Sequence, residues 1–168
     1  YGSKQPFKID LNKHHPDQKI QGLDKLNFNN LVEDASFMHD TLGYALFRAA
    51  GVASPRTAYA WMTITIGSPE NRKPNGFYLI LENIDQRFAK DRFGTSKTPI
   101  FKPVTPYLFS YLGEDWSAYD RIYDLKTEAT DAQKQQVIDF ANSLTNDDDD
   151  VFAARINQFV DLDQFSRY

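Results

Sequence analysis

The chain has 168 residues, of which 41% are hydrophobic and 25% are charged, with a formal net charge of −4 and no cysteine. This composition is that of one soluble globular domain or most of one, and the lack of cysteine excludes disulfides, zinc thiolates and thiol nucleophiles. The acidic balance argues against a general nucleic-acid binder, and no run of 18 apolar residues could form a membrane span.

The first part of the chain predicts two short strands and one helix. Phe7–Leu11 alternates apolar and polar residues, as a half-buried strand does, and a second strand is expected around Lys25–Phe28. Asp34 or Ser36 is expected to cap a helix that Gly51 closes. The apolar residues of this helix, with Met38 counted as core, fall at helical spacing: Met38, Leu42, Ala45, Leu46 and Ala49.

The middle of the chain predicts an antiparallel hairpin followed by a short helix. Thr57–Ile66 alternates and is rich in β-branched and aromatic residues, so it is expected to be a strand. The loop Gly67–Gly76 leads to a buried returning strand, Phe77–Leu81. A helix is expected over Asp85–Arg92, with Gly94 at its end.

The last part predicts irregular strands and then helices. "IFKP" and "IYDLKT" are typical of short strands, and Thr130 with Gln133 fits a capping box. The run Asp147–Asp150 lacks the spacing of a calcium loop and is expected to offset a helix dipole. The order of elements predicts an α+β fold: a mainly antiparallel sheet with one long helix in the first two-thirds, and helices toward the C-terminus.

Four lysines lie inside short apolar runs and are the first candidates for binding. Because a strand places alternate side chains on one face, each lysine faces either water or a cleft lined by the sheet. The solvent-facing arrangement is the ordinary one for any single lysine. Four in one sheet-rich region favour a basic cleft for an anion, usually phosphate. These lysines are Lys8, Lys25, Lys102 and Lys126.

Glu82 directly follows the buried strand, and an unpaired carboxylate there would cost several kcal/mol. A cationic partner is therefore expected, and Lys8, Lys25 and Arg56 are the candidates. An acid paired with a strand lysine is also how kinase small lobes hold the lysine that binds the phosphates of ATP.

Seven segments, taken in order, resemble the spore-coat-protein-H (CotH) kinase family, atypical kinases of spore coats and secreted bacterial proteins. "KQPFKIDL" resembles its lysine-rich strand, and "QGLDKLNFNN" resembles its Gly-x-x-Lys-Leu run. "SFMHDTLGYALFRAAGVASPRTAYAWMTI" resembles its first long helix with the Pro-Arg turn that follows. "NGFYLILENIDQRFAKDRFG" resembles its hairpin strand, and "IFKP", "YDLKTE" and "LDLDQFSRY" complete the order.

The resemblance implies a kinase that transfers phosphate from ATP to Ser or Thr of a protein acceptor, with Mg²⁺. Residues 1–94 would form a small-lobe-like sheet and helix, and residues 95–168 would begin the larger lobe. The implied nucleotide-binding residues are Lys8, Lys25, Glu82, Lys102 and Lys126. We expect a monomer at the cell or spore surface or outside the cell. No signal-peptide pattern is present, but the chain begins at Tyr1 rather than Met, which leaves the native compartment open.

The chain departs from the family pattern in two respects. The family usually has Arg-Glu on the first helix, where this chain has His39-Asp40. The family's glycine-rich segment would precede Tyr1, and its catalytic and metal-binding segments would follow Tyr168. We therefore expect these 168 residues to fold and to bind nucleotide weakly, but not to transfer phosphate.

The alternative is a non-catalytic module of a secreted or cell-surface protein that binds carbohydrate or another protein. Aromatic side chains could form a stacking platform for such a ligand, although most rings of this kind pack in cores. The candidate rings are Trp61, Tyr107, Tyr111, Trp116 and Tyr119.

Overall fold

The computed structural model describes residues 4–65, 67–69 and 72–168. The chain divides into two compact units, Tyr1–Asn83 and Ile84–Tyr168, and each has its own cluster of buried hydrophobic residues. The class is α+β with a curled antiparallel sheet and with helices toward the C-terminus, which confirms the predicted fold class. The assignment of the two parts to kinase lobes stays a prediction.

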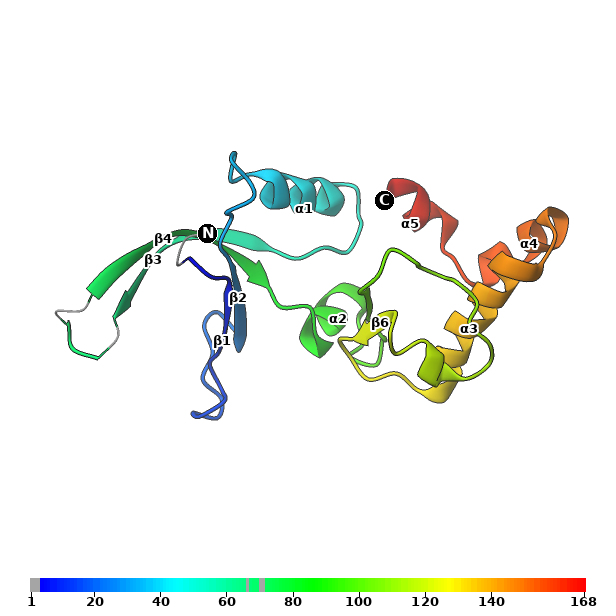
Figure 1. The fold of residues 1–168 in the computed structure, drawn as a ribbon, viewed down its shortest axis with the longest axis horizontal. Coiled ribbons are helices and arrows are strands. Elements are labelled where there is room, and N and C mark those ends of the chain that lie inside the picture. The colour runs from blue at the N-terminus through cyan, green and yellow to red at the C-terminus, as the bar shows by residue number, and fades with distance from the viewer. Residues whose placement is uncertain (1–3, 66, 70–71) are drawn as a thin grey trace. The chain divides into compact units, whose positions relative to one another are not determined.

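The first unit is built on a four-stranded antiparallel sheet with the order β1-β2-β4-β3. The strands are β1 Phe7–Asp10, β2 Lys25–Asn29, β3 Thr57–Thr65 and β4 Arg72–Glu82. The predicted hairpin is present, and Figure 1 shows β3 and β4 extending well beyond β1 and β2. The predicted loop was too long at one end, because Gly76 lies within β4. Its residues 70 and 71, like residue 66 before it, lie outside the described residues.

Alternation along the strands gives this sheet an apolar face. Leu26, Phe28 and Tyr78 are buried there, and the Phe7 ring stacks on Phe28 with 4.7 Å between the centroids. Tyr78 and Leu79 are fully buried because β4 lies between β2 and β3. The expectation of a buried central strand is thus confirmed.

Helix α1, His39–Ala49, begins later than predicted and is eleven residues long, so the detail of one long helix is not confirmed. Asp34 lies in the loop before it, but its carboxylate does accept a hydrogen bond from the main-chain N–H of His39 at 2.8 Å. Gly51, with φ of +81°, follows the helix as expected.

The apolar residues of α1 do not form a core face in this unit, which corrects the prediction for Met38. Met38, Leu42 and Leu46 are 48%, 55% and 69% exposed. The helix is instead held by polar contacts: Asn29 of β2 donates to Asp40 at 2.9 Å, and the Ser54 hydroxyl donates to the Tyr44 carbonyl at 2.9 Å. Helical spacing identified the helix but did not identify the side that meets the sheet.

The second unit begins with α2, Gln86–Phe93, as predicted. The Asp85 side chain accepts hydrogen bonds from two N–H groups of its first turn, and Gly94 with φ of +75° ends it. The two expected short strands form and pair with each other: β5 Phe101–Pro103 and β6 Tyr123–Leu125. A short 3₁₀ helix, Trp116–Ala118, lies between them in the chain.

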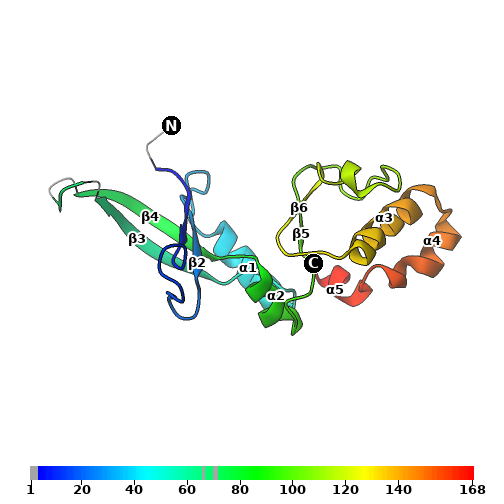
Figure 2. The same ribbon diagram turned by 90° about the horizontal axis from the view of Figure 1, so that it is seen from below.

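Three α-helices complete the second unit, as Figure 2 shows. They are α3 Asp131–Asn146, α4 Asp149–Arg155 and α5 Leu162–Arg167, with a 3₁₀ turn at Ile156–Gln158. The predicted capping box of Thr130 and Gln133 is present at the start of α3. The aspartate run ends α3 and begins α4, where the Asp148 carboxylate caps the helix as the dipole argument predicts.

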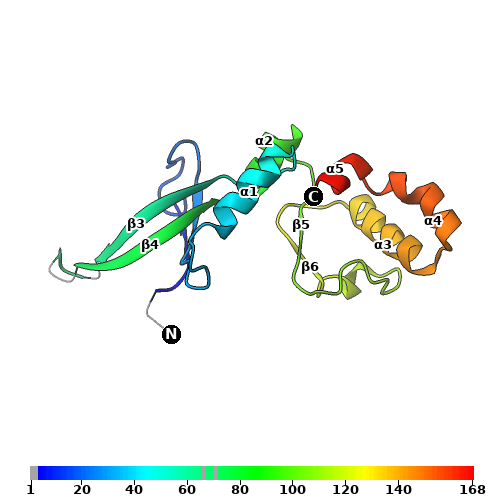
Figure 3. The ribbon, with the colours of Figure 1, turned by 90° about the horizontal axis from the view of Figure 1, so that it is seen from above.

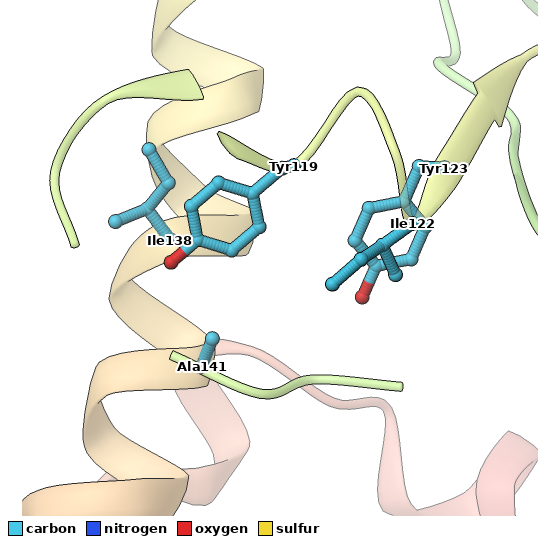
Figure 4. Packing of buried hydrophobic residues seen from close by; sticks show 5 residues of the cluster. All are labelled: Tyr119, Ile122, Tyr123, Ile138 and Ala141. Carbon is cyan, nitrogen blue, oxygen red and sulfur yellow. The ribbon is translucent and has the colours of Figure 1, made fainter. Parts of the chain in front are cut away.

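The core of the second unit is aromatic. Tyr119, Ile122 and Tyr123 come from one turn of chain and pack against Ile138 and Ala141 of α3, as Figure 4 shows. Tyr119 and Ala141 are fully buried. None of the helices formed by the described residues is both long and apolar enough to cross a membrane.

Candidate functional site

The end of β4 carries an ion pair between a buried carboxylate and a half-exposed guanidinium. The Glu82 side chain is 3% exposed, and its carboxylate accepts from the Arg56 guanidinium at 2.5 Å and from the Arg56 main-chain N–H at 2.9 Å. The main-chain N–H of Glu82 donates in turn to the Arg56 carbonyl at 3.0 Å. Of the three predicted partners of Glu82, the structure therefore selects Arg56, and β3 and β4 are fixed together at this end.

The two lysines near Glu82 do not pair with it. Lys8 faces Asn27 across β1 and β2, and its amine donates to the Asn83 side-chain oxygen at 2.9 Å. The Asn27 amide donates to the same oxygen at 3.2 Å. Because successive residues of a strand point to opposite faces, Asn83 lies on the face opposite Glu82.

Lys25 lies on the same face as Lys8, two positions away along the β1–β2 ladder and opposite Asp10. Within the part of the chain that the structure describes, its amine has neither a hydrogen bond nor an ion pair. We call the surface formed by Lys8, Lys25, Asn27 and Asn83 the lysine face. It presents two ammonium groups and two amides, which are the groups that bind phosphate oxygens, together with the exposed carboxylate of Asp10, which lies opposite Lys25 on the same face.

A pocket of about 500 Å³ lies in the same unit, beside the start of α1. Its charged or ionisable lining residues are Glu33, Asp34, His39 and Asp40. His39 and Asp40 stand where the family usually has Arg-Glu, and Asp40 accepts from Asn29 instead of from a cation. Three carboxylates at one pocket disfavour a polyphosphate, so the lysine face is the better site for an anion.

The other two candidate lysines lie in the second unit, on the β5–β6 hairpin. Lys102 is opposite Asp124 in the ladder, and the Lys126 amine forms an ion pair with the Asp124 carboxylate. Lys126 itself follows β6 by one residue, and its N–H donates to the Ile100 carbonyl at 2.8 Å. The carboxylate of Asp124 thus offsets one of the two positive charges.

The structure therefore brings the candidate lysines together in two pairs, one in each unit. Lys8 and Lys25 share a face of the sheet, and Lys102 and Lys126 flank Asp124. No candidate lysine lines the pocket beside α1 or the pocket of the second unit at Leu112 and Ile122. Convergence of all four on one phosphate pocket stays a prediction.

A magnesium ion bound by a kinase needs carboxylate ligands near the phosphates. Among the described residues, no group of three or more His, Asp or Glu side chains is arranged to hold a metal ion. The described residues therefore contain no carboxylate cluster that by itself marks a site for such an ion.

Asparagine side chains are the part of this site that the sequence analysis missed. Asn27 and Asn29 alternate along β2 in "KLNFNN", and Asn83 follows the central strand. That alternation is the available signal, because it places polar side chains on one face of a strand. Only the register between β2 and β4 shows that Asn27 and Asn83 meet.

The rings of the alternative stacking platform do not all face solvent. Tyr119 is fully buried, and Trp116 stacks on it with 5.7 Å between centroids. Tyr111 packs against the same core and donates to Glu114 at 2.6 Å. Tyr107, 73% exposed, and Trp61, 69% exposed, remain available, in different units.

Comparison with known proteins assigns the chain to a family. A search of curated protein sequences finds no match. The family model described as CotH kinase protein matches residues 1–168, which is the whole chain. The chain therefore belongs to the CotH kinase protein family.

Proposed function

We propose that the lysine face binds the phosphates of ATP, in a protein that transfers phosphate to Ser or Thr of a protein acceptor. The family is kinase-like, and the observation that supports this proposal best is the arrangement around Asn83. Its side-chain oxygen orients the Lys8 amine and the Asn27 amide on one face of the sheet. A lysine held by a neutral amide keeps its positive charge available to an anion.

Lys8 and Lys25 have complementary roles in this proposal. The Lys8 ammonium has three N–H donors and gives one to Asn83, which leaves two for phosphate oxygens. Lys25 supplies a second positive charge on the same face, where the two ammonium groups outnumber the single carboxylate of Asp10. Two ammonium groups near a polyphosphate supply charge neutralisation, which accounts for much of phosphoryl-transfer catalysis.

The remaining candidates have supporting roles. We propose Glu82 as a positioning residue, because its carboxylate is already bound to Arg56 and holds β3 and β4 at the end where Asn83 emerges. Lys102 and Lys126 would supply a second cationic pair. Asp124 offsets the charge of Lys126, with which it forms an ion pair, so the charge of Lys102 remains for an anion.

Transfer by a kinase also requires a held metal ion and a group that positions the acceptor hydroxyl. Because these residues hold no cluster of metal ligands, we propose that the 168-residue chain binds ATP weakly and does not transfer phosphate. The association of the family with the spore coat supports a location at the cell or spore surface, with a protein as the acceptor.

Equilibrium binding of ATP to the 168-residue chain tests the site. The Lys8→Ala variant is expected to bind at least tenfold more weakly than the parent, whereas Lys13→Ala, in an exposed loop, binds equally well. Equal binding by the two variants would disprove the role of the lysine face. A thermal-shift series with ATP and with oligosaccharides separates the kinase-like function from the carbohydrate-binding alternative.

A radiolabel assay with ATP, magnesium and a Ser/Thr-rich protein tests the second part of the proposal. We expect no incorporation above background by the 168-residue chain. Robust transfer by the purified chain would refute this part, while leaving the binding result unaffected.

A further inference from the structure

The two edges of the sheet in the first unit differ in how they are protected. Edge strand β1 has four residues, and two of them, Lys8 and Asp10, are charged. Edge strand β3 has nine residues, "TAYAWMTIT", with no charge, no proline and no glycine. Proteins normally protect an edge with short length, charges, proline or a covering segment, because exposed strand edges pair with other strands. β3 lacks the first three devices, and α1, which contacts β3, makes no hydrogen bond to its main chain.

The main chain of β3 is free to pair on its outer side. β3 pairs with β4 along its length, and Figure 3 shows the two strands side by side. The main chain of β3 makes no other hydrogen bond within the part of the protein that the structure describes. The one irregularity in the hairpin does not disturb this edge. Met62 faces Gly76 and Thr63 faces Pro74, so the extra residue, Asn75, belongs to β4.

Large apolar side chains on β3 also face water. Trp61, at the centre of the strand, is 69% exposed, and Tyr59 on the same face is 40% exposed. An exposed tryptophan between an uncharged edge and a second exposed ring is typical of a surface that another protein segment covers.

We propose that, in place of the monomer expected from the sequence, two copies of this chain pair through β3, in antiparallel orientation about a two-fold axis at Trp61. A two-fold axis perpendicular to the sheet leaves each side chain on the face of the sheet that it already occupies. Two residues can therefore pair across this axis only when their side chains lie on the same face. Centring the pairing on Trp61 is the arrangement that uses all nine residues. It joins the two four-stranded sheets into one sheet of eight strands.

The strand is complementary to itself in this arrangement. On one face, Trp61 meets Trp61 of the second copy and Tyr59 meets Thr63, an aromatic with a β-branched residue. On the other face, the small Ala58 and Ala60 meet the larger Ile64 and Met62. The pairs of the nine-residue ladder are therefore matched in both size and polarity.

Charge also favours a second copy as the occupant. β3 has no charged side chain, so the proposed pairing places no like charges opposite each other across the two-fold axis. Residues 1–83 contain nine Lys and Arg against eight Asp and Glu, so two of these units repel each other weakly. A strand edge alone buries less area than a standard interface, so we expect a dimer that dissociates on dilution.

Sedimentation equilibrium of the 168-residue chain tests the proposal. The parent is expected to approach twice the monomer mass as its concentration rises. Trp61→Lys and Trp61→Glu place like charges opposite each other at the axis, so each variant alone is expected to be monomeric. An equimolar mixture of the two is expected to dimerise again, because Lys and Glu then meet. Tyr107→Lys, an equally exposed change in the other unit, should leave the dimer intact.

Several results would overturn the proposal. These are a parent that stays monomeric at its highest soluble concentration, open-ended aggregates, dimers that persist in both charge variants, and a mixture that fails to recover. If the charge variants do not fold, Trp61→Cys decides the matter. In this cysteine-free chain it should give a disulfide-linked dimer under oxidation, and Tyr107→Cys should not.

Discussion

Each of the two units is built around one fully buried tyrosine, and the two tyrosines are held in different ways. In the first unit the Tyr78 hydroxyl donates to the Gln5 carbonyl at 3.0 Å, 73 residues away in the chain. In the second unit the Tyr119 hydroxyl donates to the Gly113 carbonyl at 3.0 Å and accepts from the Leu112 N–H at 2.9 Å. Tyr78 closes a long-range contact, whereas Tyr119 closes a local loop.

The same difference extends to the surrounding cores. Tyr78 packs with Phe7 and Phe28, so three separate strands must meet before its core exists. Tyr119 packs with Ile122 and Tyr123 of its own segment, and α3 covers them. Long-range contacts cost more chain entropy to form than local ones. The first unit therefore depends on correct strand register, and the second depends on how well one helix covers a preformed turn.

The largest effect is expected from removing the central ring of the second unit. Tyr119→Ala leaves a cavity against Ile138 and Ala141 and should lower the free energy of unfolding by about 4 kcal/mol. Denaturant unfolding followed by tryptophan fluorescence measures this, because Trp116 stacks on Tyr119. Tyr107→Ala, at a 73% exposed ring, is the control and should leave stability unchanged. Similar midpoints for the two variants would contradict this account of the core.

The next effect is expected at the ion pair of Glu82 and Arg56 in the first unit. Glu82→Ala removes the carboxylate that accepts from the Arg56 guanidinium and main-chain N–H, and because the arginine side chain is 54% exposed and water can replace the carboxylate, the change should cost about 2 kcal/mol of stability. Glu82→Gln keeps one oxygen acceptor and should cost less. Thermal melting and ATP binding, measured on the same samples, separate the two possible roles. Weaker ATP binding with an unchanged melting temperature would show that Glu82 contacts the nucleotide directly.

Local sequence patterns predicted most elements of both units. Gly94 ended α2, the Thr130 and Gln133 pair began α3, and alternation identified β1 and β3. Each of these signals acts within a few residues, so it can be read without knowing the fold. The orientation of α1 could not be predicted in this way, because its contacts with the sheet include a side-chain hydrogen bond from Asn29 to Asp40, which the spacing of apolar residues does not reveal.

The candidate site was less predictable than the fold for a related reason. The sequence indicated that Glu82 needs a partner and offered three cations, but the partner depends on which strand lies next to β4. Likewise, Lys8 and Asn83 are 75 residues apart, and only the register from β1 through β2 to β4 brings them together. Lysines inside strands signalled a site, while the amides that orient them required the sheet topology.

A smaller effect is expected from removing only the hydroxyls of the two central tyrosines. Tyr119→Phe leaves both the Leu112 N–H and the Gly113 carbonyl unpaired and should cost roughly 1–2 kcal/mol. Tyr78→Phe removes the hydrogen bond to the Gln5 carbonyl, near the start of the chain, and should cost about 1 kcal/mol or less. Denaturant unfolding gives the energies, and hydrogen exchange locates the change. If the two variants lost protection against hydrogen exchange equally in both units, the contrast between the local contacts of Tyr119 and the long-range contact of Tyr78 would be contradicted.

The smallest expected effect is a difference in pH dependence between the first turn of α1 and the first turn of α3. Hydrogen bonds from the Ser36 hydroxyl and from the His39 and Ser36 N–H groups, with the nearby His39 charge, lower the pKa of Asp34 below its ordinary value. A lowered pKa means that this stabilisation is complete above about pH 3.9 and is lost as the pH falls through the pKa of the folded state. The capping box of α3 uses the neutral side chains of Thr130 and Gln133, so it does not titrate.

Acid should therefore loosen the first turn of α1 before it affects the first turn of α3. Amide exchange measured by NMR between pH 5 and pH 3 tests this, with protection of the His39 N–H as the readout for α1 and of the Gln133 N–H for α3. Asp34→Asn is the matched control, because asparagine keeps one of the two side-chain oxygen acceptors but carries no charge to lose. Its α1 protection should be independent of pH over this range. An equal acid response in the parent and the variant would mean that Asp34 is not the group that titrates.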